Sequence, residues 1–111
     1  MAVRDEIPDA VAIEEDLYRV PRHPVDVFIR TSGREFMVFA PICDLAGARR
    51  GDFPVYLLER NASPKVMPGA FAIYDGKVVY RMFVPFGQLA DACARVLTTT
   101  QAYAPKILPM L

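Results

Sequence analysis

The chain contains few of the residues from which catalytic and metal centres are usually built. It has one histidine, His23, and two cysteines, Cys43 and Cys93, which stand far apart in the sequence. These three residues do not supply the close ligand pairs of a zinc site. The six glycines occur singly, so no phosphate-binding loop is indicated either. The sequence therefore predicts no metal, no cofactor and no catalytic residue.

Neither sign of charge is in excess, and no long apolar run is present. The chain carries 13 basic and 13 acidic side chains, with a sequence pI near 6.6. Broad basic fields hold proteins on nucleic acid or anionic lipid, so neither nucleic acid nor a membrane is expected as a partner. No stretch approaches the roughly eighteen apolar residues of a membrane span. The start of the chain is too acidic for a signal peptide, and the two separate cysteines suit a reduced protein, so we expect a cytoplasmic location.

Apolar residues, by contrast, make up 53% of the chain, and ten prolines divide them into short elements. The alternation over 25–30 and the apolar run 36–40, which ends at Pro41, predict a β-hairpin. Residues 17–20 predict a short edge strand before it. The segment 9–15 is predicted to form a short helix that its first residue, an aspartate, caps.

The second half of the chain reads as a helix, a hairpin and a long helix. Asp52 is predicted to cap a short helix that ends at Asn61. The Asp-Gly pair at 75–76, between two alternating apolar runs, is a strong signal for a two-residue hairpin loop. Apolar residues at three- and four-residue spacings over 88–104 predict an amphipathic helix that ends before Pro105.

Together these elements predict one α+β domain over 1–111. Its antiparallel sheet of about five strands would carry a short middle helix and a long C-terminal helix. A chain of 111 residues is expected to bury roughly 65% of its unfolded surface, which provides one core and no second domain. Residues 1–12 are expected to have little regular structure, and 105–111 to form an apolar C-terminal tail.

The second hairpin has a register that follows from its loop. A two-residue loop places Phe71 opposite Tyr80 and Ile73 opposite Val78, which puts these four side chains on one face of the sheet. The other face carries Tyr74 and other large apolar groups, whereas only the last helix is long enough to cover a face. Some apolar side chains are therefore expected to meet a second chain. We predict these partner-binding or dimer contacts: Tyr56, Tyr74, Phe83, Ile107 and Leu108.

The order of elements over 53–104 resembles the type III secretion chaperone-like superfamily, and within it the YbjN-like family of sensory transduction regulators. The string Leu-Leu-Glu-Arg-Asn at 57–61 closes the middle helix. The strand from Gly69 to Tyr74, the turn at 75–76, the returning strand 77–85 and the helix from Leu89 to Tyr103 then follow in the order that the family shows. The resemblance implies a homodimeric, non-catalytic protein that holds an extended segment of a client protein along apolar grooves.

Three functions remain open on the sequence. The first is a non-catalytic, chaperone-like homodimer that binds an apolar or extended segment of an unidentified partner protein. The second is a regulatory or sensory domain that binds a small molecule between the C-terminal helix and the sheet. The third is an enzyme that depends on His23 or Cys43. His23 lies between Pro21 and Pro24, in a connection between extended segments, where a surface position is the simpler interpretation.

Overall fold

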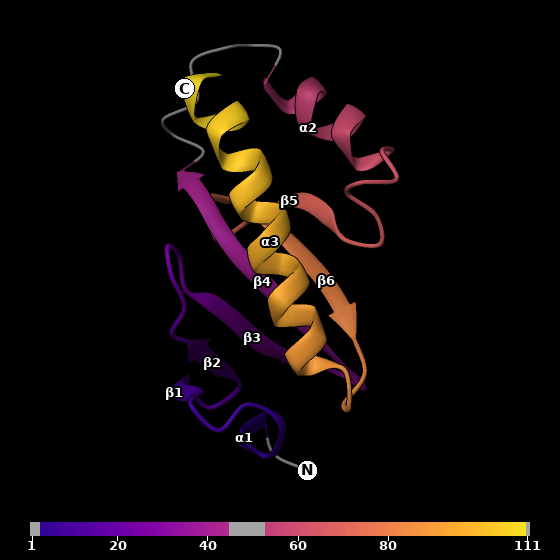
Figure 1. Cartoon of the computed structure of the whole chain (residues 1–111). Helices are drawn as coiled ribbons and strands as arrows, with labels where there is room; N and C mark the ends of the chain where they lie inside the picture. Colours follow the sequence, from indigo (N-terminus) through magenta and orange to yellow (C-terminus); the bar gives the residue numbers. More distant parts are fainter. Residues whose placement is uncertain (1–2, 45–52, 111) are drawn as a thin grey trace.

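The computed structural model describes residues 3–44 and 53–110 of the chain. Within those ranges, a six-stranded antiparallel sheet forms the body of the molecule, and one long helix crosses it (Figure 1). The elements are, in chain order, α1 (Val3–Glu6), β1 (Val11–Glu14), β2 (Leu17–Val20), β3 (Val27–Ser32), β4 (Glu35–Asp44), α2 (Phe53–Asn61), β5 (Ala70–Tyr74), β6 (Lys77–Val84), α3 (Leu89–Ile107) and a 3-10 turn, η2 (Leu108–Met110).

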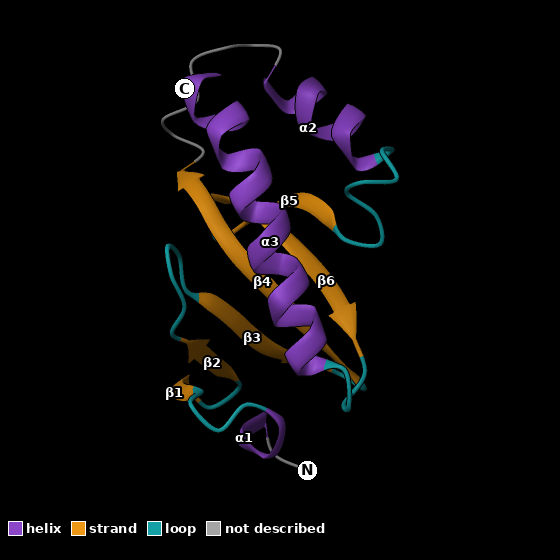
Figure 2. Cartoon of the chain, viewed as in Figure 1, coloured by secondary structure: helices purple, strands orange, loops and turns teal. Residues whose placement is uncertain are grey.

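The strands of the sheet lie in the order β1-β2-β3-β4-β6-β5 (Figure 2). Neighbours along the chain pair as hairpins, except that β4 pairs with β6 and leaves β5 at the far edge. The predicted α+β class is confirmed, with a short middle helix and a long C-terminal helix. The sheet has one strand beyond the expected number because β1 forms where the sequence suggested a helix.

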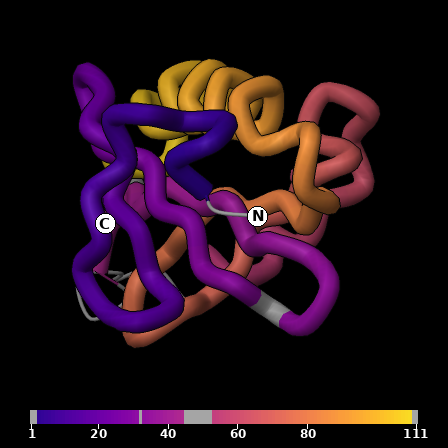
Figure 3. The backbone as a smooth tube through the Cα atoms, turned by 90° about the horizontal axis from the view of Figure 1, so that it is seen from below, coloured from indigo at the N-terminus to yellow at the C-terminus, as the bar shows by residue number. Residues whose placement is uncertain are grey.

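The main core lies between α3 and the sheet face that it crosses, which we call the covered face. Figure 3 shows α3 as a layer along one side of the strands. Alternate strand residues point at the helix, so Ile29, Val38 and Val78 are fully buried. Full burial of such side chains stabilises the fold by about 1.5 to 3 kcal/mol each. The helix contributes a stripe of buried residues at three- and four-residue spacings: Leu89, Ala92, Cys93, Val96, Thr100, Tyr103 and Ile107.

The hairpin of β5 and β6 has the predicted register. Phe71 pairs with Tyr80 and Ile73 with Val78, across a loop whose two residues, Asp75 and Gly76, have positive φ angles of 52° and 74°. Two consecutive residues with positive φ define the turn that matches the twist of paired strands. The Asp-Gly pair therefore fixes which side chains of β6 face α3 and which face away.

The predicted helix over 9–15 is wrong. Residues Val11–Glu14 form strand β1 instead, and all four are exposed. The Asp9 carboxylate does not cap a helix. It accepts a hydrogen bond of 2.6 Å from the Arg22 guanidinium instead. The sequence predicted that β2 is an edge strand. Because β1 pairs with it, β2 is an interior strand of the sheet instead.

Strand β4 does not end at Pro41. It continues to Asp44, and a shift of register between Pro41 and Cys43 marks a bulge in its pairing with β6. Pairing with β3 reaches only as far as Phe39, so no strand on that side needs an N–H from Pro41. A proline inside a sheet is tolerated under these conditions.

Helix α3 likewise passes through Pro105 and ends at Ile107. The first three residues of the predicted tail, 105–107, therefore belong to the helix. A proline in the last turn removes a single intrahelical hydrogen bond, whereas the side chain of Ile107, two residues further on, is completely buried. Burial of this side chain outweighs the lost bond. No helix within 3–44 and 53–110 combines the length and apolar character that crossing a membrane requires.

A side chain far away in the sequence holds the start of α3 in place. The Glu6 carboxylate of α1 accepts hydrogen bonds from the backbone N–H groups of Gly87 and Leu89, at 2.7 and 3.1 Å. It thereby caps α3, whose own N-cap residue, Gln88, provides no side-chain cap. The predicted cap of α2, Asp52, lies outside the described residues, but its predicted end at Asn61 is confirmed.

Candidate partner-binding surface

The face of the sheet turned away from α3, which we call the open face, is apolar over most of its centre. A buried cluster lies here, separate from the main core, and consists of Met37, Phe39 and Val79. Val79 is only 1% exposed although no described helix covers this face, because neighbouring side chains on β3, β4 and β5 close over it. The partly buried members that pack against this cluster are Leu17, Phe28, Ala72 and Tyr74.

Three aromatic rings run across the open face. Phe28 stacks on Phe39 with ring centroids 5.5 Å apart, and Phe39 meets Tyr74 at 5.0 Å in a tilted arrangement. Phe28 and Phe39 are directly paired residues of β3 and β4, whereas Tyr74 comes from β5 beyond the intervening strand β6. Such contacts stabilise each pair by about 0.5 to 1.5 kcal/mol and hold the rings in fixed positions.

These rings form the floor of a shallow hollow of about 500 Å³. Its volume lies within the roughly 300 to 1,000 Å³ typical of ligand-binding pockets. The hollow has an apolar floor and a charged rim. The floor consists of Leu17, Phe28, Phe39, Pro41, Tyr74 and Val79, and the rim of Glu14, Arg30, Asp75 and Lys77.

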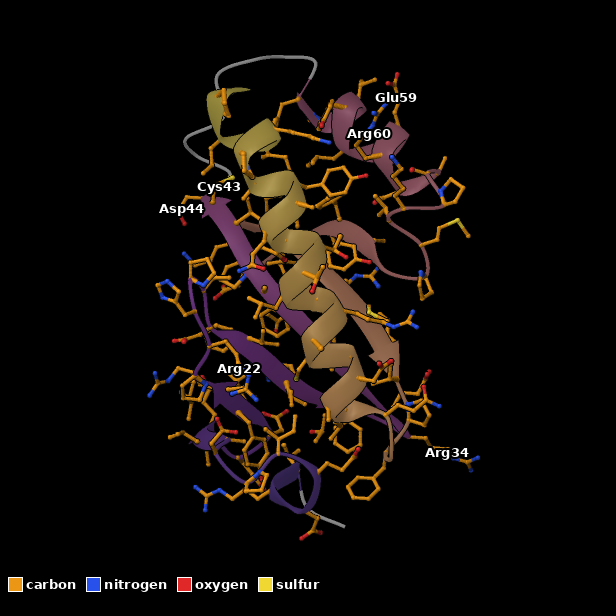
Figure 4. The ribbon with its side chains drawn as sticks, in the orientation of Figure 1. Arg22, Arg34, Cys43, Asp44, Glu59 and Arg60 are labelled. Atoms are coloured by element: carbon orange, nitrogen blue, oxygen red, sulfur yellow. The ribbon has the colours of Figure 1, made fainter. Side chains whose placement is uncertain are left out.

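The basic side chains around the hollow have acidic partners. Arg30 contacts Asp16 at 3.1 Å and Glu14 at 3.5 Å, and its guanidinium lies 5.9 Å from the Tyr74 ring centre. Desolvation lowers the pKa of Arg30, but Tyr74 and the two carboxylates outweigh it, so the pKa is raised overall. Lys77 forms a 2.7 Å ion pair with Asp44 at the end of β4, and this hydrogen bond raises the pKa of Lys77 (Figure 4 labels Asp44).

Beyond the hollow, the open face continues over Arg81 and Phe83 of β6. Phe83 is 45% exposed and pairs in register with Met37. The Arg81 guanidinium lies over the Phe83 ring, 4.8 Å from its centre. Cation and ring thus present one flat, partly apolar surface to solvent.

A second apolar surface lies at the sheet edge, between α2 and β5. We call it the α2–β5 patch and define it by Val55, Leu58 and Ile73, which are 53%, 70% and 50% exposed. A groove of about 310 Å³ runs along it. Asn61 fixes α2 against β5, since its side-chain amide exchanges two hydrogen bonds with the backbone of Phe71, at 2.6 and 3.1 Å.

The structure separates the five predicted contact residues. Tyr74 and Phe83 both belong to the open face. Tyr56 is half-buried on α2, where Arg60 lies 5.2 Å from its ring centre. Ile107 is buried in the core of its own chain, whereas Leu108 is 46% exposed just beyond α3.

The five predicted contacts do not include the aromatic centre of the open face. Phe28 and Phe39 belong to the surplus of apolar side chains from which contacts with a second chain are expected on the sequence, but the sequence does not place them side by side. The missing information was the pairing of β3 with β4, which brings the two rings together. The hairpin register places Arg81 on this face, but Arg81 is not among the predicted contacts, because a basic residue in a strand normally suggests only a solvent-facing position.

The groups on which the other two functions depend lie elsewhere. Burial raises the pKa of the Cys43 thiol, so it is protonated at neutral pH and a poor nucleophile. His23 is exposed in the connection between β2 and β3. A hollow of about 280 Å³ lies between α3 and β6, where a small molecule would have to bind, with Arg95, Thr98 and Thr99 on its helix side. Among the described residues, no group of three or more potential ligands is arranged for a metal ion.

Comparison with solved structures identifies the fold. The chain is similar to a chain of the heterodimeric ExoU–SpcU complex from the type III secretion system of Pseudomonas aeruginosa, with a TM-score of 0.68 and 16% identity over 91% of this chain and 87% of that one. It is also similar to a chain of the ExsC–ExsE complex, with a TM-score of 0.66 and 14% identity over 86% and 79% of the two chains. The protein therefore has the type III secretion chaperone-like fold that the order of elements suggested.

Sequence comparison adds no family to this fold. No protein-family model matches the chain, and no curated protein does. The YbjN-like assignment thus stays a prediction.

Proposed function

We propose that the protein is a chaperone-like module that holds an extended, apolar segment of a partner protein against the open face of its sheet. The observation that carries this proposal is the apolar floor of the hollow together with Phe83, which is 45% exposed, on a sheet face that no described helix covers. Proteins rarely leave a large, continuous apolar surface in water unless it binds something. An extended segment fits because its alternate side chains can enter the hollow and reach Phe83 while the backbone stays outside.

The similar structures support a protein partner. Both contain two different proteins in complex, ExoU with SpcU and ExsC with ExsE. We transfer only one general feature of these complexes to this chain, which is the binding of a second protein.

We further propose that two copies associate through the α2–β5 patch. In a two-fold symmetric dimer, residues near the axis face their own copies, which favours apolar groups over charged ones. Val55, Leu58 and Ile73 meet this requirement, whereas the open face would bring Arg81 toward a second basic surface. The predicted contact Tyr56 lies on the same helix, and Tyr74 and Phe83 are left for the client.

Selection from a library of short random peptides displayed on phage tests client binding. We expect peptides selected on the wild-type protein to lose most of their affinity for Phe83→Glu, because the substitution removes an apolar ring from the open face and places there a charge that binding would take out of water. Met67→Glu is the matched control, since Met67 is also a large exposed apolar residue, 59% exposed, but lies outside the open face. A failure to select any peptide, or equal losses in both variants, would contradict client binding at this face.

Sedimentation at micromolar concentration tests self-association separately. We expect a dimer for the wild type and for Met67→Glu, and a shift toward monomer for Leu58→Glu. A wild-type protein that sediments only as the 12.4 kDa species would exclude the dimer and leave client binding untouched.

A further inference from the structure

Within the part of the chain that the structure describes, Arg81 differs from the other basic residues of the open face because it has no acidic partner. Arg19 pairs with Asp26 at 3.4 Å, and Arg30 and Lys77 have the partners given above. In residues 3–44 and 53–110, the interaction found for the Arg81 guanidinium is with the ring of Phe83. Arg81 is therefore the one cation of this face whose charge the described chain does not neutralise with a carboxylate.

The position of Arg81 makes this charge important for binding. It lies on a central strand, paired in register with Phe39 of β4 on one side and Ala70 of β5 on the other. Apolar surface surrounds it, and its own side chain is already partly buried. A segment that covered the open face would remove the guanidinium from water. Burying a charge without a partner costs several kcal/mol, so the segment must supply an anion or leave this part of the face uncovered.

We infer that the segment bound by the open face is an extended strand with one acidic side chain between apolar ones, and that its carboxylate pairs with Arg81. This inference rests on the proposed function and names the chemistry of the client. In an extended segment, side chains two positions apart point to the same face. In a segment that runs along β6, an acidic residue placed over Arg81 would thus have apolar neighbours over Val79, at the hollow, and over Phe83. The ring of Phe83 holds the guanidinium in place, and a planar guanidinium can bind both oxygens of a carboxylate.

The charge of the face argues against the other occupants. A basic segment would place a second cation beside Arg81 without a carboxylate between them. A second copy of this face would do the same near a two-fold axis. A purely apolar segment would bury the guanidinium unpaired. Only a client with an acidic side chain satisfies both the apolar surface and the cation within it.

The peptide selection described above also tests this inference, with a different variant. We expect peptides selected on the wild type to carry Asp or Glu at one fixed position between apolar residues, and to bind Arg81→Gln about ten-fold more weakly or worse. Arg34→Gln is the matched control, because Arg34 is an exposed arginine at the β3–β4 turn that points away from the sheet (Figure 4). It should bind these peptides like the wild type.

A change in the peptide keeps the test valid if Arg81→Gln folds poorly. Replacement of the selected acidic residue by its amide should weaken binding to the wild-type protein by a similar factor. Selected peptides with no enrichment in acidic residues, or equal binding by wild type and Arg81→Gln, would overturn the inference and leave the proposed function standing. Equal losses in Arg81→Gln and Arg34→Gln would also overturn it, because they indicate a general effect of charge. If no peptide is selected at all, the proposed function fails and the inference with it.

Discussion

The two faces of the sheet use the same strands in opposite ways. On the covered face, side chains such as Ile29 and Val38 are fully buried beneath α3. On the open face, the residues next to them in sequence, such as Phe28 and Met37, belong to a separate cluster that no described helix covers. The period of two in a strand creates both sets at once, so a chain with one long helix can cover only the first. The covered face holds the main core, and the open face is the one that we propose for binding.

The largest expected difference between the faces concerns adjacent residues of β3. Ile29→Ala should lower the free energy of unfolding by about 2 to 5 kcal/mol, because it leaves a cavity in a closed core. Phe28→Ala should cost less, since the shortened side chain leaves a gap that solvent and neighbouring rings can fill. Urea denaturation of both variants measures this. A greater loss for Phe28→Ala would mean that the open face is a second structural core.

Alkaline pH tests the covered face alone, through the thiol of Cys93, which lies on α3 and is buried against that face. Burial raises the pKa of the Cys93 thiol from an ordinary value of 9.0 to about 11. Well below pH 9 the thiol is protonated in both the folded and the unfolded state, so its contribution to the free energy of unfolding does not change with pH there. Between pH 9 and 11 the unfolded chain ionises first, and the folded state should lose about 2 to 3 kcal/mol from this group.

Cys93→Ala provides the measurement for that prediction. The variant should be less stable than the wild type at neutral pH by about 1 to 3 kcal/mol, and the difference should shrink as the pH rises toward 11. Thermal or urea melts at several pH values record it. A constant difference over this range would show that the thiol reaches solvent in the folded protein. Peptide binding at the open face should be the same in both proteins at neutral pH.

The position of α3 over the covered face depends on Glu6. Glu6→Ala removes the acceptor for two N–H groups at the start of α3 and should lower the free energy of unfolding by about 1 to 2 kcal/mol. Glu15→Ala, in the exposed turn between β1 and β2, is the control and should have little effect. Equal stability of the two variants would mean that water replaces the cap at no cost.

Local patterns in the sequence predicted the elements with strong signals and failed where distant contacts decide. The Asp-Gly turn and the spacing of α3 depend on neighbouring residues, so the hairpin register and the helix could be derived. The cap by Glu6 and the strand β1 depend on partners elsewhere in the chain. The continuation of β4 through Pro41 and of α3 through Pro105 depends on such partners as well. The same limit applies to the candidate site. The shared face of Tyr74, Arg81 and Phe83 followed from one hairpin, whereas the place of Phe39 beside them required the order of strands.

The smallest expected effect on stability is at Phe83, and it distinguishes the faces most sharply. Phe83→Glu should change the free energy of unfolding by less than about 1 kcal/mol, because the side chain is 45% exposed and the new carboxylate can stay in water beside Arg81. The same substitution should remove most of the affinity for peptides selected on the wild type. Urea melts and peptide binding, measured on one protein preparation, compare the two effects. A variant that loses stability and affinity together would show that the open face supports the fold, and the division between a structural and a binding face would then be wrong.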